Sequence, residues 1–200
     1  MAGDPVRTTN SILTNVALPK RRRARGLRAI ALSAVLLAAP LLAGCGATTG
    51  EGDTVNDDRA VLLERPSIEQ ISERYEQMQE AITARLSDEL GPWEWVNDEN
   101  ATSAGCAEFP NVGGESRALD RRHFKGNLPD ESWNRAVEIV VEIGGEYGFG
   151  EPETVVDRPG DHEIVGRDPF GARYTFGTAA NTLLTVITGC HLPEEAIDGA

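Results

Sequence analysis

The sequence predicts an α+β domain: an antiparallel sheet with a C-terminal meander, packed by one or two helices and held by one disulfide. Three observations support this prediction. They are two segments with helical spacing of apolar residues, four short β-type segments near the C-terminus, and a pair of cysteines far apart in the chain. We expect the domain to cover residues 65–193 and residues 194–200 to form an acidic tail.

The first helix is expected to begin after Pro66. Ser67 stands at the N-cap position with Gln70 three residues later, which is the pattern of a capping box. Apolar residues then recur every three or four positions, at Ile68, Ile71, Tyr75, Met78, Ile82, Leu86 and Leu90. Gly91-Pro92 ends the helix. The stripe is only about three heptads long, so packing on the sheet is favoured over a coiled-coil seam or a partner-binding face.

A second helix is expected from Pro129-Asp130 to a C-terminal cap at Gly148. Its apolar side consists of Trp133, Ala136, Val137, Val140, Ile143 and Tyr147. Between the helices, Trp93 begins an extended stretch, and residues 103–110 contain Cys106. Residues 116–128 fit either a further strand or a long loop.

The last fifty residues change to the pattern of strands, which we expect at 154–156, 162–165, 172–176 and 183–188. The sequence "DPFG" at 168–171 has Asp first, Pro second and Gly fourth, which is typical of a type I turn. Residues 177–181 join the next pair. These segments predict the antiparallel meander.

Residues 1–44 are predicted to be a lipoprotein signal peptide. A cationic cluster from Lys20 precedes an apolar core at 29–43 that is too short for a comfortable membrane span. The core ends in "LAGC" at 42–45, which resembles the lipobox of bacterial lipoproteins. That resemblance implies a diacylglycerol thioether on Cys45, which becomes the first residue after cleavage. The alternative is a truncated transmembrane helix with an incidental cysteine. Two acyl chains give a lasting anchor, and residues 45–64 are expected to be a flexible tether.

The charge separates these two parts of the chain. Residues 1–44 contain seven of the 19 Lys and Arg and one of the 32 Asp and Glu, so the remainder has a formal charge of −19. Such a field repels phosphate, which argues against nucleic acid and bare anionic lipid as direct partners. The expected partners are the membrane, through the covalent lipid at Cys45, and an envelope protein or cell-wall component.

Lipid attachment at Cys45 leaves Cys106 and Cys190 as an even pair. Because an exported chain meets an oxidising environment, a disulfide between them is favoured. Closing so long a loop is worth ~4.5 kcal/mol in the chain-entropy model. The alternative is that Cys190, next to His191, is a nucleophile or a metal ligand.

No catalytic residue, metal site or cofactor is predicted. The histidines lack a second ligand at helical spacing, and no GxSxG motif occurs. The acidic segment 157–168 has oxygen ligands for calcium without the spacing of an EF-hand, so a solvated hairpin rim is favoured. Its carboxylates are Asp157, Asp161, Glu163 and Asp168. The tryptophans Trp93, Trp95 and Trp133 could line a groove for a sugar or an apolar ligand, but core packing is favoured.

Four sequence blocks resemble the LppA family of mycobacterial and related actinobacterial lipoproteins. They are "RPSIEQISERYEQMQEAI" at 65–82, "GCAEFP" at 105–110, "DPFGA" at 168–172 and "NTLLTVITGCHLP" at 181–193. The resemblance covers about residues 62–193 and implies a membrane-anchored envelope lipoprotein. Cys106, Cys190 and the turn at 168–171 are the matched positions with a structural character. The resemblance supplies no catalytic residue and no ligand.

We therefore expect a non-enzymatic, lipid-anchored binding or scaffolding protein on the extracytoplasmic face of the cell membrane. Two alternatives remain: an envelope hydrolase using carboxylates, and a carrier of a small apolar or lipid molecule. A deep cleft that brings together two acids and a tryptophan would favour the hydrolase, whereas a flat sheet face would favour a binding protein.

Overall fold

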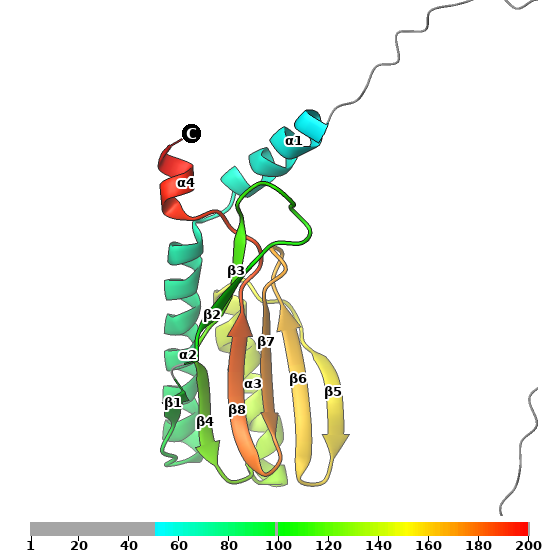
Figure 1. Cartoon of the computed structure of the whole chain (residues 1–200). Coiled ribbons are helices and arrows are strands. Elements are labelled where there is room, and N and C mark those ends of the chain that lie inside the picture. The colour runs from blue at the N-terminus through cyan, green and yellow to red at the C-terminus, as the bar shows by residue number, and fades with distance from the viewer. Residues whose placement is uncertain (1–50, 99, 200) are drawn as a thin grey trace, which may run out of the picture. The chain divides into compact units, whose positions relative to one another are not determined.

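Eight antiparallel strands and two long helices form two layers in the computed structural model, which describes residues 51–98 and 100–199 (Figure 1). The α+β fold predicted from the sequence is confirmed. The strands are β1 (Val96–Asp98), β2 (Thr102–Gly105), β3 (Glu115–Ala118), β4 (Arg121–Lys125), β5 (Glu153–Arg158), β6 (Asp161–Arg167), β7 (Arg173–Thr178) and β8 (Asn181–Ile187). The helices are α1 (Glu51–Leu63), α2 (Ile68–Leu90), α3 (Asp130–Glu146) and α4 (Glu194–Asp198).

The order of the main sheet is β1-β4-β8-β7-β6-β5, and β5 to β8 form the predicted meander. A two-stranded ribbon of β2 and β3 joins the sheet through β3, which pairs with β8. Within the described residues, no helix is both long enough and apolar enough to cross a bilayer.

The capping box predicted for α2 is present. Ser67 Oγ accepts a hydrogen bond from Gln70 N at 3.2 Å, and Ser67 N donates to Gln70 Oε1 at 3.3 Å. The apolar stripe of α2 packs on its own sheet, as expected from its length. Its buried hydrophobic residues are Ile68, Ile71, Tyr75, Met78, Ile82 and Leu86.

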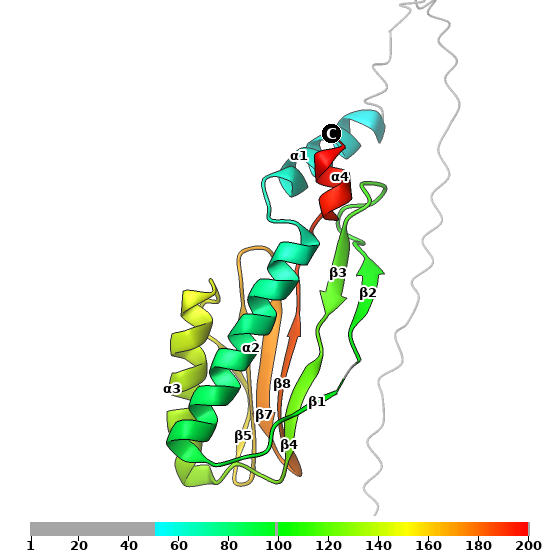
Figure 2. The same ribbon diagram turned by 90° about the vertical axis from the view of Figure 1, so that its left-hand side faces the viewer.

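Helix α3 lies beside α2 on the same face of the sheet (Figure 2). It ends as predicted near Gly148, whose φ of 96° suits a residue without a Cβ. Between the two helices and the sheet lies the main core, in which Trp133 stacks on Phe176 with ring centroids 5.3 Å apart. Tyr174 is fully buried against Gly144 and Gly166, which leave room for its ring.

The opposite face of the sheet has no helix over it in the described part of the chain (Figure 2). Strict alternation of burial along β6 and β8 places one set of side chains on this face. Val165, Thr175 and Thr185 lie in one row across neighbouring strands, each of them half-buried. We call this surface the open face of the sheet.

The segment 116–128 resolves into two strands with a break at Leu119-Asp120. β8 pairs with β3 on one side of the break and with β4 on the other. Asp120 stabilises the break because its Oδ1 accepts hydrogen bonds from Asn100 N and Ala101 N, both at 2.9 Å.

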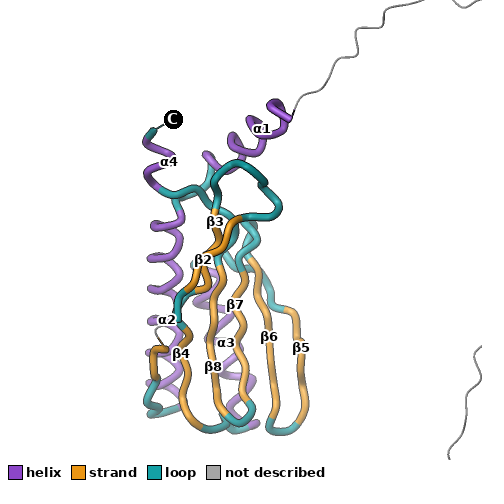
Figure 3. The backbone as a smooth tube through the Cα atoms, in the orientation of Figure 1, coloured by secondary structure: helices purple, strands orange, loops and turns teal. Residues whose placement is uncertain are grey.

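The tether predicted for residues 45–64 is wrong over 51–63, which form α1. Leu62 is completely buried, and the Arg59 guanidinium donates to Ala196 O at 2.7 Å, so contacts with the rest of the fold stabilise this helix. The acidic tail also differs from the prediction, because residues 194–198 form α4. Together with the long loop between β2 and β3, these helices lie at one end of the sheet (Figure 3).

Asp168 holds the β6–β7 turn against α2. Its Oδ1 accepts hydrogen bonds from Phe170 N at 2.9 Å and Ala172 N at 2.6 Å, and its Oδ2 accepts one from Tyr75 Oη at 2.5 Å. The turn predicted from "DPFG" is therefore attached to the core by its first residue.

We predict that Asp168→Ala lowers the free energy of unfolding by about 2–4 kcal/mol. Three donors lose their acceptor, and the hydroxyl of Tyr75 is left buried without a hydrogen-bond partner. Urea denaturation followed by circular dichroism measures the change. Asp88→Ala, at an exposed position of α2, is the matched control, and equal losses in the two variants would contradict the prediction.

Candidate functional site

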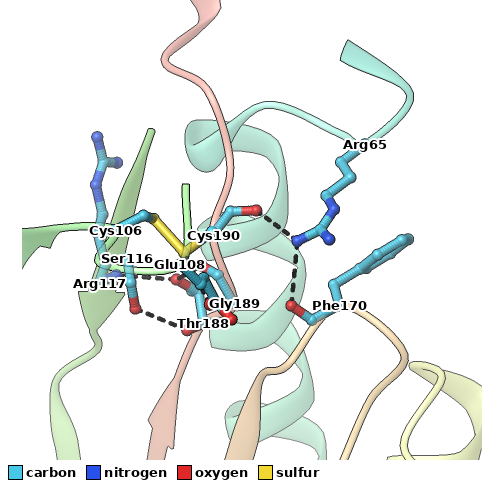
Figure 4. The surroundings of a disulfide bond; sticks show 9 residues. All are labelled: Arg65, Cys106, Glu108, Ser116, Arg117, Phe170, Thr188, Gly189 and Cys190. Atoms are coloured by element: carbon cyan, nitrogen blue, oxygen red, sulfur yellow. Dashed lines mark hydrogen bonds between the residues drawn. A yellow bond between two sulfur atoms is a disulfide. The ribbon is translucent and has the colours of Figure 1, made fainter. Parts of the chain in front are cut away.

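The predicted disulfide is present between Cys106 and Cys190 (Figure 4). Their Cα atoms are 5.9 Å apart, and the bridge closes a separation of 84 residues. It joins the end of β2 to the segment that follows β8. Cys190 is 4% exposed, and its sulfur is bonded to Cys106, so it has no thiol for nucleophilic or metal chemistry. The other predicted site, Cys45, lies outside the described residues.

Arg65 holds the chain on the other side of the disulfide (Figure 4). Its guanidinium donates to Cys190 O at 2.9 Å and to Phe170 O at 3.3 Å. The same group lies over the rings of Phe109 and Phe170, 5.1 and 5.5 Å from their centroids. One side chain thus connects the start of α2, the β6–β7 turn and the end of the disulfide loop.

His191, the neighbour of Cys190, is completely buried. Its Nδ1 lies 2.9 Å from Pro66 O, which makes Nδ1 the protonated nitrogen. Burial lowers the pKa of this imidazole, while the Pro66 carbonyl opposes the shift. His191 is therefore neutral at pH 7 and acts as a packing residue at the end of the sheet.

His162 connects α3 to the β5–β6 hairpin. Its Nδ1 lies 2.9 Å from Asp157 Oδ1, its Nε2 lies 3.2 Å from Asp130 Oδ1, and Trp133 stacks on its ring. A hydrogen bond from Gly160 N and the bond to His162 lower the pKa of Asp130. Both ring nitrogens of His162 are occupied, so the imidazole has no free nitrogen for a substrate.

The four carboxylates of the acidic segment do not converge. Asp157 of β5 and Asp161 of β6 lie near the turn between these two strands, Glu163 lies within β6, and Asp168 follows the far end of β6. Asp161 pairs with Arg158, and Asp157 faces His162. Within residues 51–98 and 100–199, no three His, Cys, Asp or Glu side chains are close enough to hold a metal ion.

The tryptophans divide between core and surface. Trp133 is buried in the main core. Trp93 stacks on Phe124 with ring centroids 4.9 Å apart, and Trp95 meets the same ring edge-on. Trp93 and Phe124 border a hollow of about 400 Å³ that also contains Glu94 and Lys125. This hollow has one carboxylate, so it does not offer the pair that glycoside hydrolysis uses.

A hollow of about 530 Å³ that is rich in acids lies between α4 and the start of α2. Its lining includes Glu69, Glu115, Arg117 and Glu194. Arg117 pairs with both Glu69 and Glu115, and Glu194 N donates to Glu69 Oε2 at 2.9 Å. Burial acts to raise the pKa of Glu69, but these hydrogen bonds outweigh it and the pKa is lowered. Glu69 is therefore an ionised partner of Arg117.

Three residues that hold distant segments together were missed by the sequence analysis: Arg65, Asp120, and Asp168 in its contact with Tyr75. Each acts on a segment that is distant in the chain or lacks periodicity. The position of Asp168 in a turn motif was the one available signal, and it predicted only the local turn.

A family model described as "LppA: Lipoprotein confined to pathogenic Mycobacterium" matches residues 46–194. Among solved structures, the chain is similar to the lipoprotein LppA from Mycobacterium tuberculosis, with 15% identity and a TM-score of 0.62, over 73% of this chain and 89% of that one. It is also similar to a DUF4853 family protein from Actinomyces odontolyticus, with 15% identity and a TM-score of 0.48, over 66% and 72%. Among curated proteins, the chain matches none.

We predict that the double variant Cys106→Ala/Cys190→Ala loses up to about 4.5 kcal/mol of unfolding free energy, because the long loop is no longer closed in the unfolded chain. Urea denaturation at pH 7 measures the loss. Wild-type protein treated with dithiothreitol is the control and should approach the same value. Two readily alkylated thiols in the untreated domain would contradict the bridge.

We predict that stability falls as the pH is lowered below about 6.5, the ordinary pKa of histidine, because the unfolded chain then binds a proton that buried His191 resists. The contribution of neutral His191 to the free energy of unfolding is complete above the ordinary pKa of histidine. It is lost as the pH falls toward the lowered pKa that His191 has in the folded state. His191→Asn can keep the hydrogen bond to Pro66 O without titrating, so its stability should depend less on pH between 7 and 5. Equal slopes in the two proteins would contradict this assignment.

Proposed function

Because the chain belongs to the LppA lipoprotein family, we propose that it is an envelope protein, lipid-anchored at Cys45, whose domain binds another envelope component without catalysing a reaction. The signal-peptide pattern before Cys45 supports the anchor. The formal charge of −19 after residue 44 favours a neutral or basic partner over an anionic surface.

The observation that carries this proposal is the open face of the sheet. On it, Leu183 and Ile187 of β8 and Val165 of β6 are half-buried apolar side chains beside Thr175 and Thr185. A broad surface that mixes apolar groups and hydroxyls on rigid strands suits recognition of a macromolecule. A sheet face without a helix over it supports a binding protein rather than a hydrolase with a deep cleft.

The acid-rich hollow also favours binding over carboxylate catalysis. A general acid needs a carboxyl that stays protonated near neutral pH, so its pKa must be raised. Glu69 shows the opposite shift, because Glu194 N and Arg117 stabilise its ionised form. The lining of this hollow contains no tryptophan, and the hollow beside Trp93 has a single carboxylate.

The test uses the full-length chain in its native membrane. We expect mass mapping to find Cys45 as an acylated N-terminus, and chemical crosslinking to give one discrete complex. The double variant Val165→Glu/Leu183→Glu should lose that complex. Its unfolding temperature should stay within a few degrees of that of the wild type, because the new charges project into solvent from the open face.

Asn134→Glu, at an exposed position of α3, is the matched control and should keep the complex. Retention of the complex by both variants would move the binding surface elsewhere. A chain without acyl groups at Cys45, or one that turns over an envelope substrate, would overturn the proposal.

A further inference from the structure

Three strands in the described part of the sheet have an edge without a partner strand: β1, β2 and β5. Two of these edges are protected against further pairing. β5 contains a bulge between Thr154 and Val156 and is followed by Pro159, and β1 has only three residues and ends at Asp98, which pairs with Arg121. Short length, bulges, charges and prolines are the usual means of protecting an edge.

The β2 edge lacks the charges and prolines that protect such edges. Its sequence, Thr-Ser-Ala-Gly at 102–105, contains no charge and no proline, and all four residues are exposed. The ladder continues beyond the strand, because Cys106 N donates to Gly114 O at 3.2 Å. The pairing of β2 with β3 thus extends over five residues.

The hydrogen-bond pattern identifies the groups on the free edge. Glu115 and Arg117 of β3 bond away from β2, toward His191 and Thr188. In an antiparallel pair, bonding residues alternate, so the residues of β2 opposite Glu115 and Arg117 direct their backbone groups outward. Gly105 and Ser103 are those residues. Each presents an N–H and a C=O on the open edge.

Both ends of this edge are fixed. At one end, Asp120 accepts hydrogen bonds from Asn100 N and Ala101 N. At the other, Cys106 is bonded to Cys190. Because the edge is held in its extended form by these contacts, a strand that pairs with it does not have to order it.

Two hollows lie on opposite sides of the β2–β3 ribbon. One, of about 290 Å³, lies on the α2 side and is lined by residues that include Ser72, Glu76 and Ser103. The other, of about 320 Å³, lies on the open-face side and is lined by residues that include Thr185 and Ile187. Side chains of an added strand alternate between the two sides, as in known modes of strand addition.

The α2 side of this edge is acidic. Glu73, Glu76 and Glu80 are exposed and lie at spacings of three and four, which places them on one side of the helix. Arg117, which also borders the hollow, is already paired with Glu69 and Glu115. Arg122 lies 3.9 Å from Glu80, which leaves Glu73 and Glu76 as the acids of interest. The remaining charge in this region attracts cationic side chains. A second copy of this acidic chain would be repelled.

From this geometry we infer that β2 is a docking edge for an extended, basic polypeptide segment, which adds to the sheet as a strand next to β2. The inference rests on the proposed function, since it names the kind of partner that the anchored domain binds. Backbone groups of Ser103 and Gly105 supply the pairing, and the glutamates of α2 select cationic side chains at alternate positions.

The test uses the ¹⁵N-labelled full-length protein in zwitterionic micelles, with the acetylated and amidated peptide Thr-Lys-Val-Lys-Thr-Lys-Val as the probe. We expect saturable shifts and slower amide exchange at Ser103 and Gly105. Ser103→Pro removes one outward N–H and leaves the bonds to β3 in place, so it should fold and lose the probe. Ser103→Ala keeps the N–H and should bind as the wild type does.

Gly105→Pro is the second edge variant, since the position has free space around it. Glu73→Gln/Glu76→Gln should weaken binding by about fivefold or more at low salt, whereas Glu131→Gln on α3 should have no effect. A peptide with glutamate in place of lysine should not bind.

The outcomes separate the edge site from the broader proposal. Probe shifts at Thr175 and Leu183 that survive Ser103→Pro would overturn the docking edge and leave the open face as the binding surface. Antiparallel pairing of two copies through β2, seen as dimerisation without peptide, would overturn the choice of partner. No shift at β2 with any peptide, while the crosslinked complex persists, would refute the edge and not the proposed function.

Discussion

The bond between Cys106 and Cys190 is the constraint on which one whole end of the structure depends. The main core contains twenty buried side chains between the helices and the sheet, whereas the cluster at this end contains four: Leu62, Val112, Cys190 and Leu192. Burying one large apolar side chain is worth roughly 1.5–3 kcal/mol. Four such side chains do not offset the conformational entropy that is lost when α1, α4 and a long loop become ordered. The covalent link removes part of that entropy cost from folding.

Polar side-chain contacts, together with the disulfide, position the loops of the fold. Arg65 and Asp120 each bond main-chain groups of segments that are far away in the sequence. Asp168 bonds main-chain groups of its own turn and the hydroxyl of the distant Tyr75. The ion pairs on the helices, such as Arg135 with Glu89, are largely exposed to solvent and contribute little. In an acidic chain, specific bonds to carbonyl and N–H groups therefore position the loops better than surface charge pairs do.

The fold could be predicted where a period or a motif was strong. The capping box and apolar stripe identified α2, the alternation at 154–188 identified the meander, and the pairing of the two cysteines followed from their number. Helix α1 was missed because Leu62 is its one buried apolar residue among those described, so its stability comes from tertiary contacts. Strand β2 was missed because its four residues are all exposed and have no alternation to detect.

The exposed residues of β2 relate the disulfide to the proposed docking edge. A free edge strand is useful for binding only if it stays extended, and it is a liability if it can rearrange or pair with any chain. The bridge at Cys106 and the hydrogen bonds from Asp120 fix the β2 edge at its two ends. The acidic side of α2 then makes pairing with a second copy unfavourable and pairing with a basic segment favourable. For the docking edge that we propose, Cys190 is thus a structural residue that helps to keep the strand extended.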